Sequence, residues 1–140
     1  MPAQPVSVVI PVLNGAATIG RQIEALAHQR AAPSFDVVLV DNGCTDDTVA
    51  VARAAAEGKL RLQVVHEAAP GVNRARNAGV RAAADGIVLL CDADDEVAPA
   101  WVASLCAGVD EAHWAAGAVD YRSLNDDATV ATWGLSLIHI

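Results

Sequence analysis

The chain has 140 residues, of which 54% are hydrophobic and 19% charged, and its formal net charge is −8 at pH 7. This composition is typical of one folded domain and excludes general disorder, because so much apolar surface would not stay solvated. The excess of acidic over basic residues argues against a nucleic-acid partner and against binding to anionic membranes, both of which select basic faces.

Four apolar runs, taken in chain order, predict four β-strands, and the longer segments between them predict helices. The runs at residues 6–13, 35–40 and 87–91 are nearly continuous, which is typical of strands covered on both faces. The run at 60–65 is the third predicted strand. Helical spacing and capping residues predict helices over residues 19–26, from Thr45 to a stop at Gly58, over 73–84 and over 99–109.

This alternation predicts an α/β fold with a mostly parallel, Rossmann-like sheet that is flanked by helices. A fifth strand is predicted over residues 114–121. Residues 1–124 are expected to form the domain and residues 125–140 an irregular tail, because the periodic pattern is lost after about Leu124. The last six residues, 135–140, resemble translated sequencing-adapter bases, so we expect a domain truncated at its C-terminus with a non-native end.

Polar or acidic residues follow three of the predicted strands. Parallel strands end at one edge of a sheet, and ligands of open α/β sheets bind beyond that edge, so we expect these residues to share a site. Each segment alone could be a turn or a helix cap, but three of them at one edge favour binding. The residues at these strand ends are Pro11, Val12, Leu13 and Asn14 for the first strand, Asp41, Asn42 and Gly43 for the second, and Asp92, Ala93, Asp94 and Asp95 for the fourth.

The last of these segments is the most acidic part of the chain. With Glu96 it places four carboxylates within five residues, and such groups repel one another unless a cation or solvent screens them. Mg²⁺ and Mn²⁺ take oxygen ligands and commonly use one or two carboxylates together with substrate phosphates. The segment therefore predicts either a divalent-cation site or a solvated acidic loop.

Three other kinds of site find no support in the sequence. The residues after the first strand lack the GxGxxG pattern of dinucleotide-binding folds, and no GxxxxGK[ST] phosphate loop is present. There is no GxSxG nucleophile motif either. His28 and His66 are predicted to be surface residues at the end of a helix and of a strand.

The cysteines and the N-terminus bear on the cellular compartment. Cys44, Cys91 and Cys106 form no CxxC pair, and we expect them to be reduced thiols in a cytoplasmic protein, with Cys91 and Cys106 buried. The first residues have no basic region followed by an apolar core, so no signal peptide is expected. No apolar run approaches the roughly 18 residues that span a bilayer, so no membrane span is expected in this segment.

Four motifs together carry a resemblance to a known family. They are VSVVIPVLN at residues 6–14, VLVDNGCTDDT at 38–48, GVNRARNAGV at 71–80 and LLCDADDEVAP at 89–99. In this order and spacing, the chain resembles the N-terminal, nucleotide-sugar-binding part of a family 2 glycosyltransferase with the GT-A fold. The resemblance covers residues 6–122.

The resemblance implies roles for the residues at the predicted edge. Residues 11–14 would line the pocket for the nucleotide base, and Asp41, with Asn42 and Gly43 beside it, would accept hydrogen bonds from that base. Arg76 would lie near the donor diphosphate. Asp92 and Asp94, with Ala93 between them, would form the metal-binding DxD motif for Mn²⁺ or Mg²⁺. Asn42, Cys44 and Leu13 stand where the family usually has Asp, Ser and an aromatic residue, which leaves the identity of the base open.

The resemblance also implies an activity. The enzyme would transfer a sugar from a nucleotide-diphosphate donor to a hydroxyl of a saccharide or lipid-linked acceptor, with inversion. The general base is expected beyond residue 140, so this segment alone is expected to be inactive, and a missing C-terminal segment could associate with the membrane. A non-catalytic nucleotide-binding module is the main alternative. An α/β phosphotransferase is a weaker one, because no Asp-x-Asp-x-Thr motif follows a strand.

Overall fold

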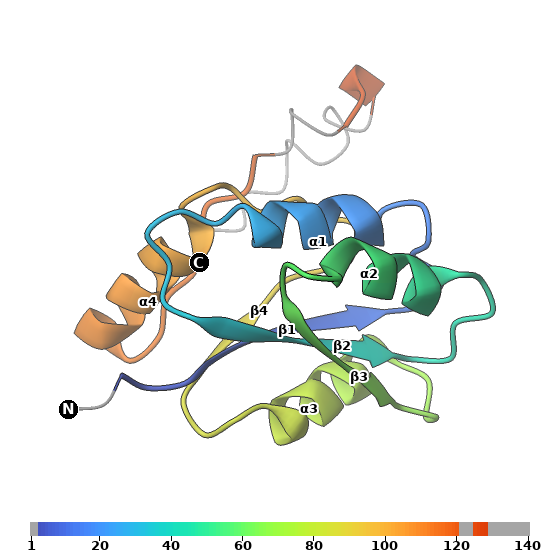
Figure 1. Ribbon diagram of the computed structural model, residues 1–140, viewed down its shortest axis with the longest axis horizontal. Coiled ribbons are helices and arrows are strands. Elements are labelled where there is room, and N and C mark those ends of the chain that lie inside the picture. Colours follow the sequence, from blue (N-terminus) through green and yellow to red (C-terminus); the bar gives the residue numbers. More distant parts are fainter. Residues whose placement is uncertain (1–2, 121–124, 129–140) are drawn as a thin grey trace.

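Strands and helices alternate from residue 6 to residue 112 in a computed structural model that describes residues 3–120 and 125–128. All four strands are parallel, which confirms the predicted α/β fold with a parallel sheet flanked by helices. The elements are β1 (Val6–Val12), α1 (Ile19–Ala27), β2 (Phe35–Asp41), α2 (Thr48–Ala56), β3 (Arg61–His66), α3 (Val72–Ala82), β4 (Ile87–Leu90) and α4 (Trp101–Ala112). The strands lie in the order β3-β2-β1-β4 (Figure 1).

Helices cover both faces of this sheet (Figure 1). On one face, Ile23 of α1 and Val102 of α4 are buried in the same cluster as Ile10 of β1, and α2 adds small side chains to it. On the other face, α3 packs Ala75 against Val9 of β1. Successive residues of β1 point to opposite faces, and all seven are buried. This explains why the run is apolar throughout rather than alternating.

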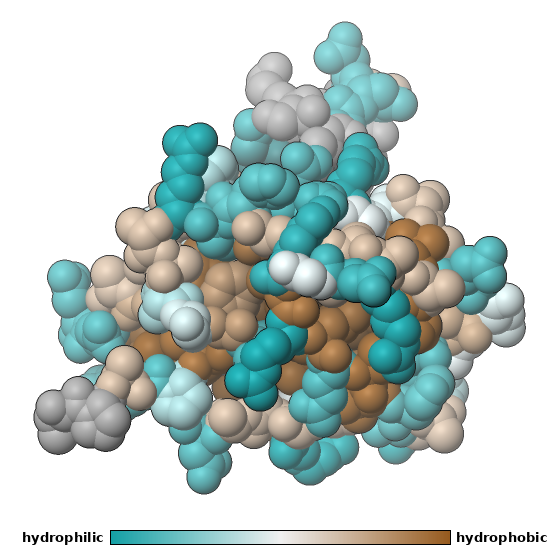
Figure 2. Space-filling model, viewed as in Figure 1, coloured by the Kyte–Doolittle hydropathy of each residue, from teal (hydrophilic) through white to brown (hydrophobic). Residues whose placement is uncertain are grey.

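The two outer strands of the sheet, β3 and β4, have exposed residues. β4 is an edge strand, since among the described residues it pairs with β1 alone. The prediction that the fourth strand is covered on both faces is confirmed only in part: Ile87 and Leu89 are buried on one face and Val88 is half-buried on the other, whereas Leu90 is 48% exposed. β3 alternates exposed and half-buried residues, as an edge strand does. In Figure 2, apolar atoms reach the surface at the centre of the view and are flanked by polar side chains.

The second helix begins later than predicted. Thr45 was expected to open it, but α2 begins at Thr48. The Asp46 carboxylate accepts hydrogen bonds from the backbone N–H of Thr48, at 3.0 Å, and from its hydroxyl. These contacts hold residues 45–47 in a turn, since a side chain that satisfies the backbone outside the helix competes with helical hydrogen bonding.

The predicted fifth strand is not formed in the part of it that the structure describes. Residues 114–120 have no regular secondary structure, and residues 121–124, at the end of the predicted domain, lie outside the described residues. Residues 129–140 of the predicted tail also lie outside them. α4 ends at Ala112, and the next residue, His113, adopts the left-handed conformation with φ of 67°. Strand propensity alone does not make a strand, because a strand also needs a neighbouring strand to pair with. In the described part of the chain, every helix is too short or too polar to cross a membrane.

Close packing of α3 on the sheet leads to a first testable expectation. A Cβ atom on Gly79 would overlap Val9 Cγ1 and lie 2.9 Å from Val40 Cγ2. We therefore expect Gly79→Ala to lower the free energy of unfolding by about 1–3 kcal/mol, the usual cost of overpacking a core. Urea denaturation followed by circular dichroism measures this difference.

Gly20 of α1 provides the matched control for that substitution. A Cβ atom there would meet only Val51 Cγ1, at 3.4 Å, and alanine is a better helix former than glycine. Gly20→Ala should therefore leave stability unchanged or raise it slightly. Equal destabilisation by both substitutions would show that the approach of α3 to the sheet is not as close as described.

Candidate functional site

The three polar segments meet at one edge of the sheet. Because β1, β2 and β4 are parallel neighbours, the residues that follow them leave the sheet at the same end (Figure 1). The backbone N–H of Asn42 donates to the carbonyl of Val12 at 2.9 Å, which ties the first two segments together. The sequence prediction that these segments share one edge is confirmed.

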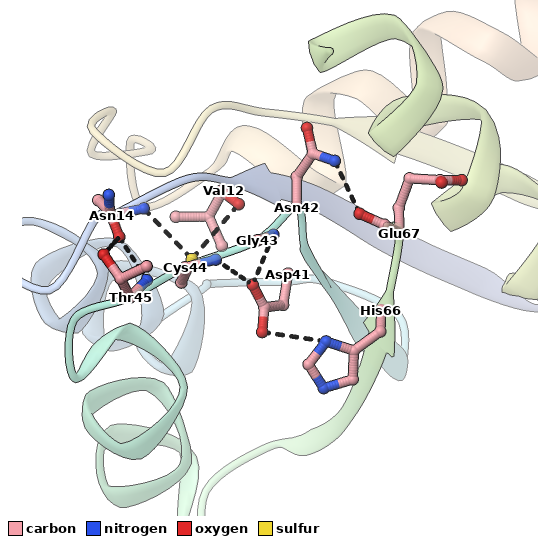
Figure 3. A network of polar contacts seen from close by, with 9 residues as sticks. All are labelled: Val12, Asn14, Asp41, Asn42, Gly43, Cys44, Thr45, His66 and Glu67. Atoms are coloured by element: carbon pink, nitrogen blue, oxygen red, sulfur yellow. Dashed lines mark hydrogen bonds and ion pairs between the residues drawn. The ribbon is translucent and has the colours of Figure 1, made fainter. Parts of the chain in front are cut away.

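Asp41 is a buried acid at this edge (Figure 3). Its side chain is 8% exposed, and its Oδ1 accepts hydrogen bonds from the backbone N–H groups of Gly43 at 3.1 Å and Cys44 at 2.7 Å. Burial alone would raise the pKa of Asp41, but hydrogen bonds from Cys44 and Gly43, with His66 nearby, lower the pKa below its ordinary value. Asp41 is therefore a carboxylate at neutral pH.

His66 is a member of this site that the sequence reasoning missed. It was predicted to be a surface residue at the end of a strand, and it is 78% exposed at the end of β3. However, its Nδ1 lies 3.1 Å from Oδ2 of Asp41 (Figure 3). The parallel register pairs Asp41 with His66, so aligning the second and third predicted strands would have placed the two residues side by side.

The four residues at the carboxyl end of β1, 11–14, divide into buried and exposed ones. Pro11 and Val12 are buried within the strand, whereas Leu13 and Asn14 are exposed at the edge of the sheet. Leu13 in particular is 59% exposed, so an apolar side chain is open to solvent at the edge of the sheet that also carries Asp41.

Asn14 holds the loop after β2 in place. It has a left-handed backbone with φ of 53°, a conformation that asparagine tolerates better than most residues. Its Oδ1 accepts a hydrogen bond from the backbone N–H of Thr45 at 2.7 Å, and its own N–H donates to Cys44 Sγ at 3.2 Å (Figure 3). The side chain of Asn14 is therefore committed to the neighbouring loop and shapes the edge of the sheet.

The side chain of Asn42 forms its hydrogen bonds with the loop that leads into α3. Its Nδ2 donates to the carbonyls of Glu67 at 2.9 Å and Ala69 at 2.8 Å, and its Oδ1 accepts from the N–H of Gly71 at 3.0 Å. Both amide donors are used, and the side chain is buried. Asn42 therefore fixes the start of the helix that carries Arg76.

Arg76 and Asp92 meet across the sheet edge. Arg76 lies on α3 and Asp92 follows β4, yet Nη2 of Arg76 is 2.9 Å from Oδ1 of Asp92. Ala93 is buried and turns the chain, so that Asp94 is exposed. The structure thus brings the predicted diphosphate-binding arginine next to the first aspartate of the DxD motif.

Asp94 stands apart from these pairs, since it has no ion pair or side-chain hydrogen bond with the described residues. No three His, Cys, Asp or Glu side chains of the described residues are placed to share a metal ion. Burial and then the charges of Asp92 and Asp94 raise the pKa of Asp95. These residues supply one or two carboxylates, which is the share that a hard divalent cation commonly takes from a protein when its other ligands come from a phosphate and from water.

The cysteines lie as predicted. Cys91 and Cys106 are buried and Cys44 is half-buried, and all three are free. Burial raises the pKa of the Cys91 thiol, which keeps it protonated. Cys44 Sγ lies 3.6 Å from the carbonyl of Val12 and so helps join the first two strand ends.

Comparison with known proteins identifies the family. The sequence profile described as Glycosyl transferase family 2 matches residues 7–136, which is most of the chain. The chain belongs to this family. The resemblance drawn from the four motifs is thereby confirmed, and the matched range includes every strand end described above.

Relatives within the family and solved structures agree with this assignment. The succinoglycan biosynthesis protein ExoU of Rhizobium meliloti is 41% identical over 92 residues, covering 64% of this chain and 26% of ExoU. The crystal structure of S. aureus TarS in complex with UDP matches with a TM-score of 0.68 and 31% identity, covering 78% of this chain and 33% of that one.

A third similar structure contains both a metal and a nucleotide. Glucosyl-3-phosphoglycerate synthase from Mycobacterium tuberculosis, in complex with Mn²⁺, UDP and glucosyl-3-phosphoglycerate, matches with a TM-score of 0.64 and 28% identity. The match covers 76% of this chain and 39% of that one. The chain spans about a quarter of the length of the first curated relatives it matches, so it corresponds to one part of a family 2 glycosyltransferase.

Proposed function

We propose that this chain is the donor-binding part of a glycosyltransferase that moves a sugar from a nucleoside-diphosphate donor to a hydroxyl acceptor with the help of a divalent cation. One observation carries the proposal. A buried carboxylate, Asp41, and a cation–carboxylate group, Arg76 with Asp92 and Asp94, lie at one edge of one parallel sheet. Complexes of similar proteins with UDP and with Mn²⁺ support it.

Each residue has a chemical role in this proposal. The Asp41 carboxylate accepts hydrogen bonds from the N–H groups of a base, with Leu13 against its apolar face. Arg76 faces the diphosphate, which leaves the reaction with added negative charge. Asp94 would hold Mn²⁺ or Mg²⁺, whose positive charge would stabilise the negative charge of the leaving diphosphate.

The transfer step itself needs one further group. The bond between the anomeric carbon and the diphosphate oxygen breaks as the acceptor oxygen forms its bond to that carbon. The acceptor proton passes to a general base, which we place beyond residue 140, and attack from the far side inverts the configuration. A saccharide or lipid-linked hydroxyl as acceptor, and a cytoplasmic location with reduced cysteines, complete the proposal.

Titration calorimetry of the 140-residue chain with UDP, GDP and dTDP tests donor binding. We expect binding in Mn²⁺ or Mg²⁺ and loss of most of it in chelator, with at most a weak preference for a pyrimidine base. The physical reason is that two phosphates cannot approach four carboxylates without a cation between them. Equal affinity in metal and in chelator would contradict the metal role.

Activity separates the enzyme from a non-catalytic nucleotide-binding module. A longer chain that carries the downstream family segment should release free nucleotide from the donor in the presence of acceptor. Donor binding without any such release in the longer chain would favour the non-catalytic module.

A further inference from the structure

Gln22 is a buried polar residue in the middle of α1, and its partners lie in the acidic loop. Its side chain is fully buried. Its Nε2 donates to the carbonyl of Asp92 at 3.0 Å, and its Oε1 accepts from the backbone N–H of Val97 at 3.0 Å. One amide thus joins the two ends of residues 92–97, the segment that carries all four clustered carboxylates.

This contact opposes the repulsion within the loop. Inside the loop, the described hydrogen bonds are those of a single turn, in which the N–H of Asp95 donates to the carbonyl of Asp92 at 3.3 Å and Oδ2 of Asp95 accepts from the N–H of Asp92 at 3.3 Å. Four like charges favour spreading of such a turn. The amide of Gln22, by contrast, is fixed to the core, because Ile19, Ile23 and Leu26 of the same helix are buried.

We propose that Gln22 is a positioning residue for the metal-binding acids. It holds the two ends of the loop 92–97 at a fixed distance on α1, and thereby sets the place of Asp92 and Asp94 at the sheet edge. This inference rests on the proposed donor- and metal-binding function. A buried amide must satisfy both its donor and its acceptor, so the two hydrogen bonds couple the loop to the helix in one geometry.

Gln29, which lies just after the C-terminal end of α1, provides a control. Its Nε2 donates to the carbonyl of Ala98 at 2.8 Å, and its Oε1 accepts from the N–H of Val102 at 2.9 Å. Its Nε2 also donates to the carbonyl of Ala25 at 3.1 Å. Like the amide of Gln22, this amide therefore donates to a backbone carbonyl and accepts from a backbone N–H. However, it holds the start of α4 instead of the acidic loop.

The experiment compares the wild-type 140-residue chain with Gln22→Met and Gln29→Met, which remove the hydrogen bonds of each amide and keep the side-chain size. Backbone hydrogen exchange measures the protection of residues 92–97 without any ligand. Titration with UDP in Mn²⁺ and in chelator gives the factor by which the metal strengthens binding. Gln22→Asn, which keeps the amide but is one methylene shorter, replaces Gln22→Met if that variant does not fold.

We expect the Gln22 variant to lose exchange protection at Val97 and its neighbours and to lower the metal-dependent factor about 10-fold or more, as loss of a group that orients a metal ligand does. The Gln29 variant should lose protection near Val102 and keep the metal-dependent factor. Unchanged exchange at residues 92–97 in the Gln22 variant overturns the positioning role, whether or not UDP binds. Lost protection with an unchanged metal-dependent factor overturns its link to the metal. A wild-type chain that binds UDP equally in chelator overturns the proposed metal function, and this inference with it.

Discussion

Asp94→Asn is expected to abolish the metal-dependent part of nucleotide binding while leaving the ligand-free fold at least as stable. Asp94 is exposed and has no ion pair or side-chain hydrogen bond with the described residues, so the fold loses no contact of the side chain. The substitution also removes one of the charges that raise the pKa of Asp95. An amide oxygen is a much weaker ligand for Mn²⁺ or Mg²⁺ than a carboxylate, so UDP affinity in Mn²⁺ should fall by about 10- to 100-fold.

Thermal melts with and without Mn²⁺ and UDP measure both effects at once. The wild-type chain should melt at a higher temperature with the two ligands together, and Asp94→Asn should lose most of that shift. Asp85→Asn serves as the charge-matched control, because Asp85 is exposed at the opposite end of the sheet, just before β4. An Asp94→Asn chain that is destabilised without ligand but keeps the full ligand-induced shift would show that Asp94 supports the loop and does not hold the metal.

Asp41→Asn is expected to weaken nucleotide binding about 10- to 100-fold at neutral pH. Asparagine preserves the shape of Asp41, and its oxygen can still accept from the N–H groups of Gly43 and Cys44. It removes the charge that strengthens a hydrogen bond from a base, which contributes about 1.5–3 kcal/mol. Calorimetry with UDP, alongside the Asp85→Asn control, measures the loss. Unchanged UDP affinity would place the base elsewhere.

The same substitution has a pH dependence whose sign follows from the lowered pKa of Asp41. A carboxyl group with a lower pKa in the fold than in the unfolded chain stabilises the fold above its unfolded pKa of about 3.9. That contribution is lost as the pH falls through the lower, folded value. We therefore expect the wild-type chain to be more stable than Asp41→Asn at pH 7, and this advantage to shrink below about pH 4.

Urea denaturation of both chains at a series of pH values from 7 to 3 follows this difference. Each chain also titrates its other carboxyl groups, but these are common to both and cancel in the comparison. A difference in stability that stays constant or grows as the pH falls would show that the hydrogen bonds to Asp41 do not favour its charged form.

The fold could be predicted from the sequence because both faces of its central strands are apolar. β1 and β2 are apolar along nearly their whole length, and only a sheet with helices on both sides buries such runs. The position of the site followed from the same reasoning, since residues at the ends of parallel strands share one edge. Asp41, Asp92 and Asp94 were found in this way without any knowledge of their contacts.

The start of the second helix and the conformation of residues 114–120 could not be predicted from the sequence, because local propensity competes there with tertiary contacts. Thr45 has the properties of a helix cap, but the side chain of Asn14 holds it in a turn with its neighbours. Residues 114–121 have the composition of a strand, yet residues 114–120 do not pair with another described strand. In both places, a partner distant in sequence, or its absence among the described residues, outweighed the local preference.

The sequence by itself determined the α/β alternation, the parallel sheet and the acids at its edge, since these depend on hydrophobic periodicity and on short motifs. Only the tertiary structure decided which polar side chains remain open to a ligand. Both N–H groups of the Asn42 amide donate to the loop before α3, and His66 lies beside Asp41. Gln22, on α1, forms hydrogen bonds with both ends of the acidic loop. These partners are 25 to 75 residues apart in the chain. Hydrogen bonds over such separations depend on strand register and helix placement, neither of which a pattern of single residues contains.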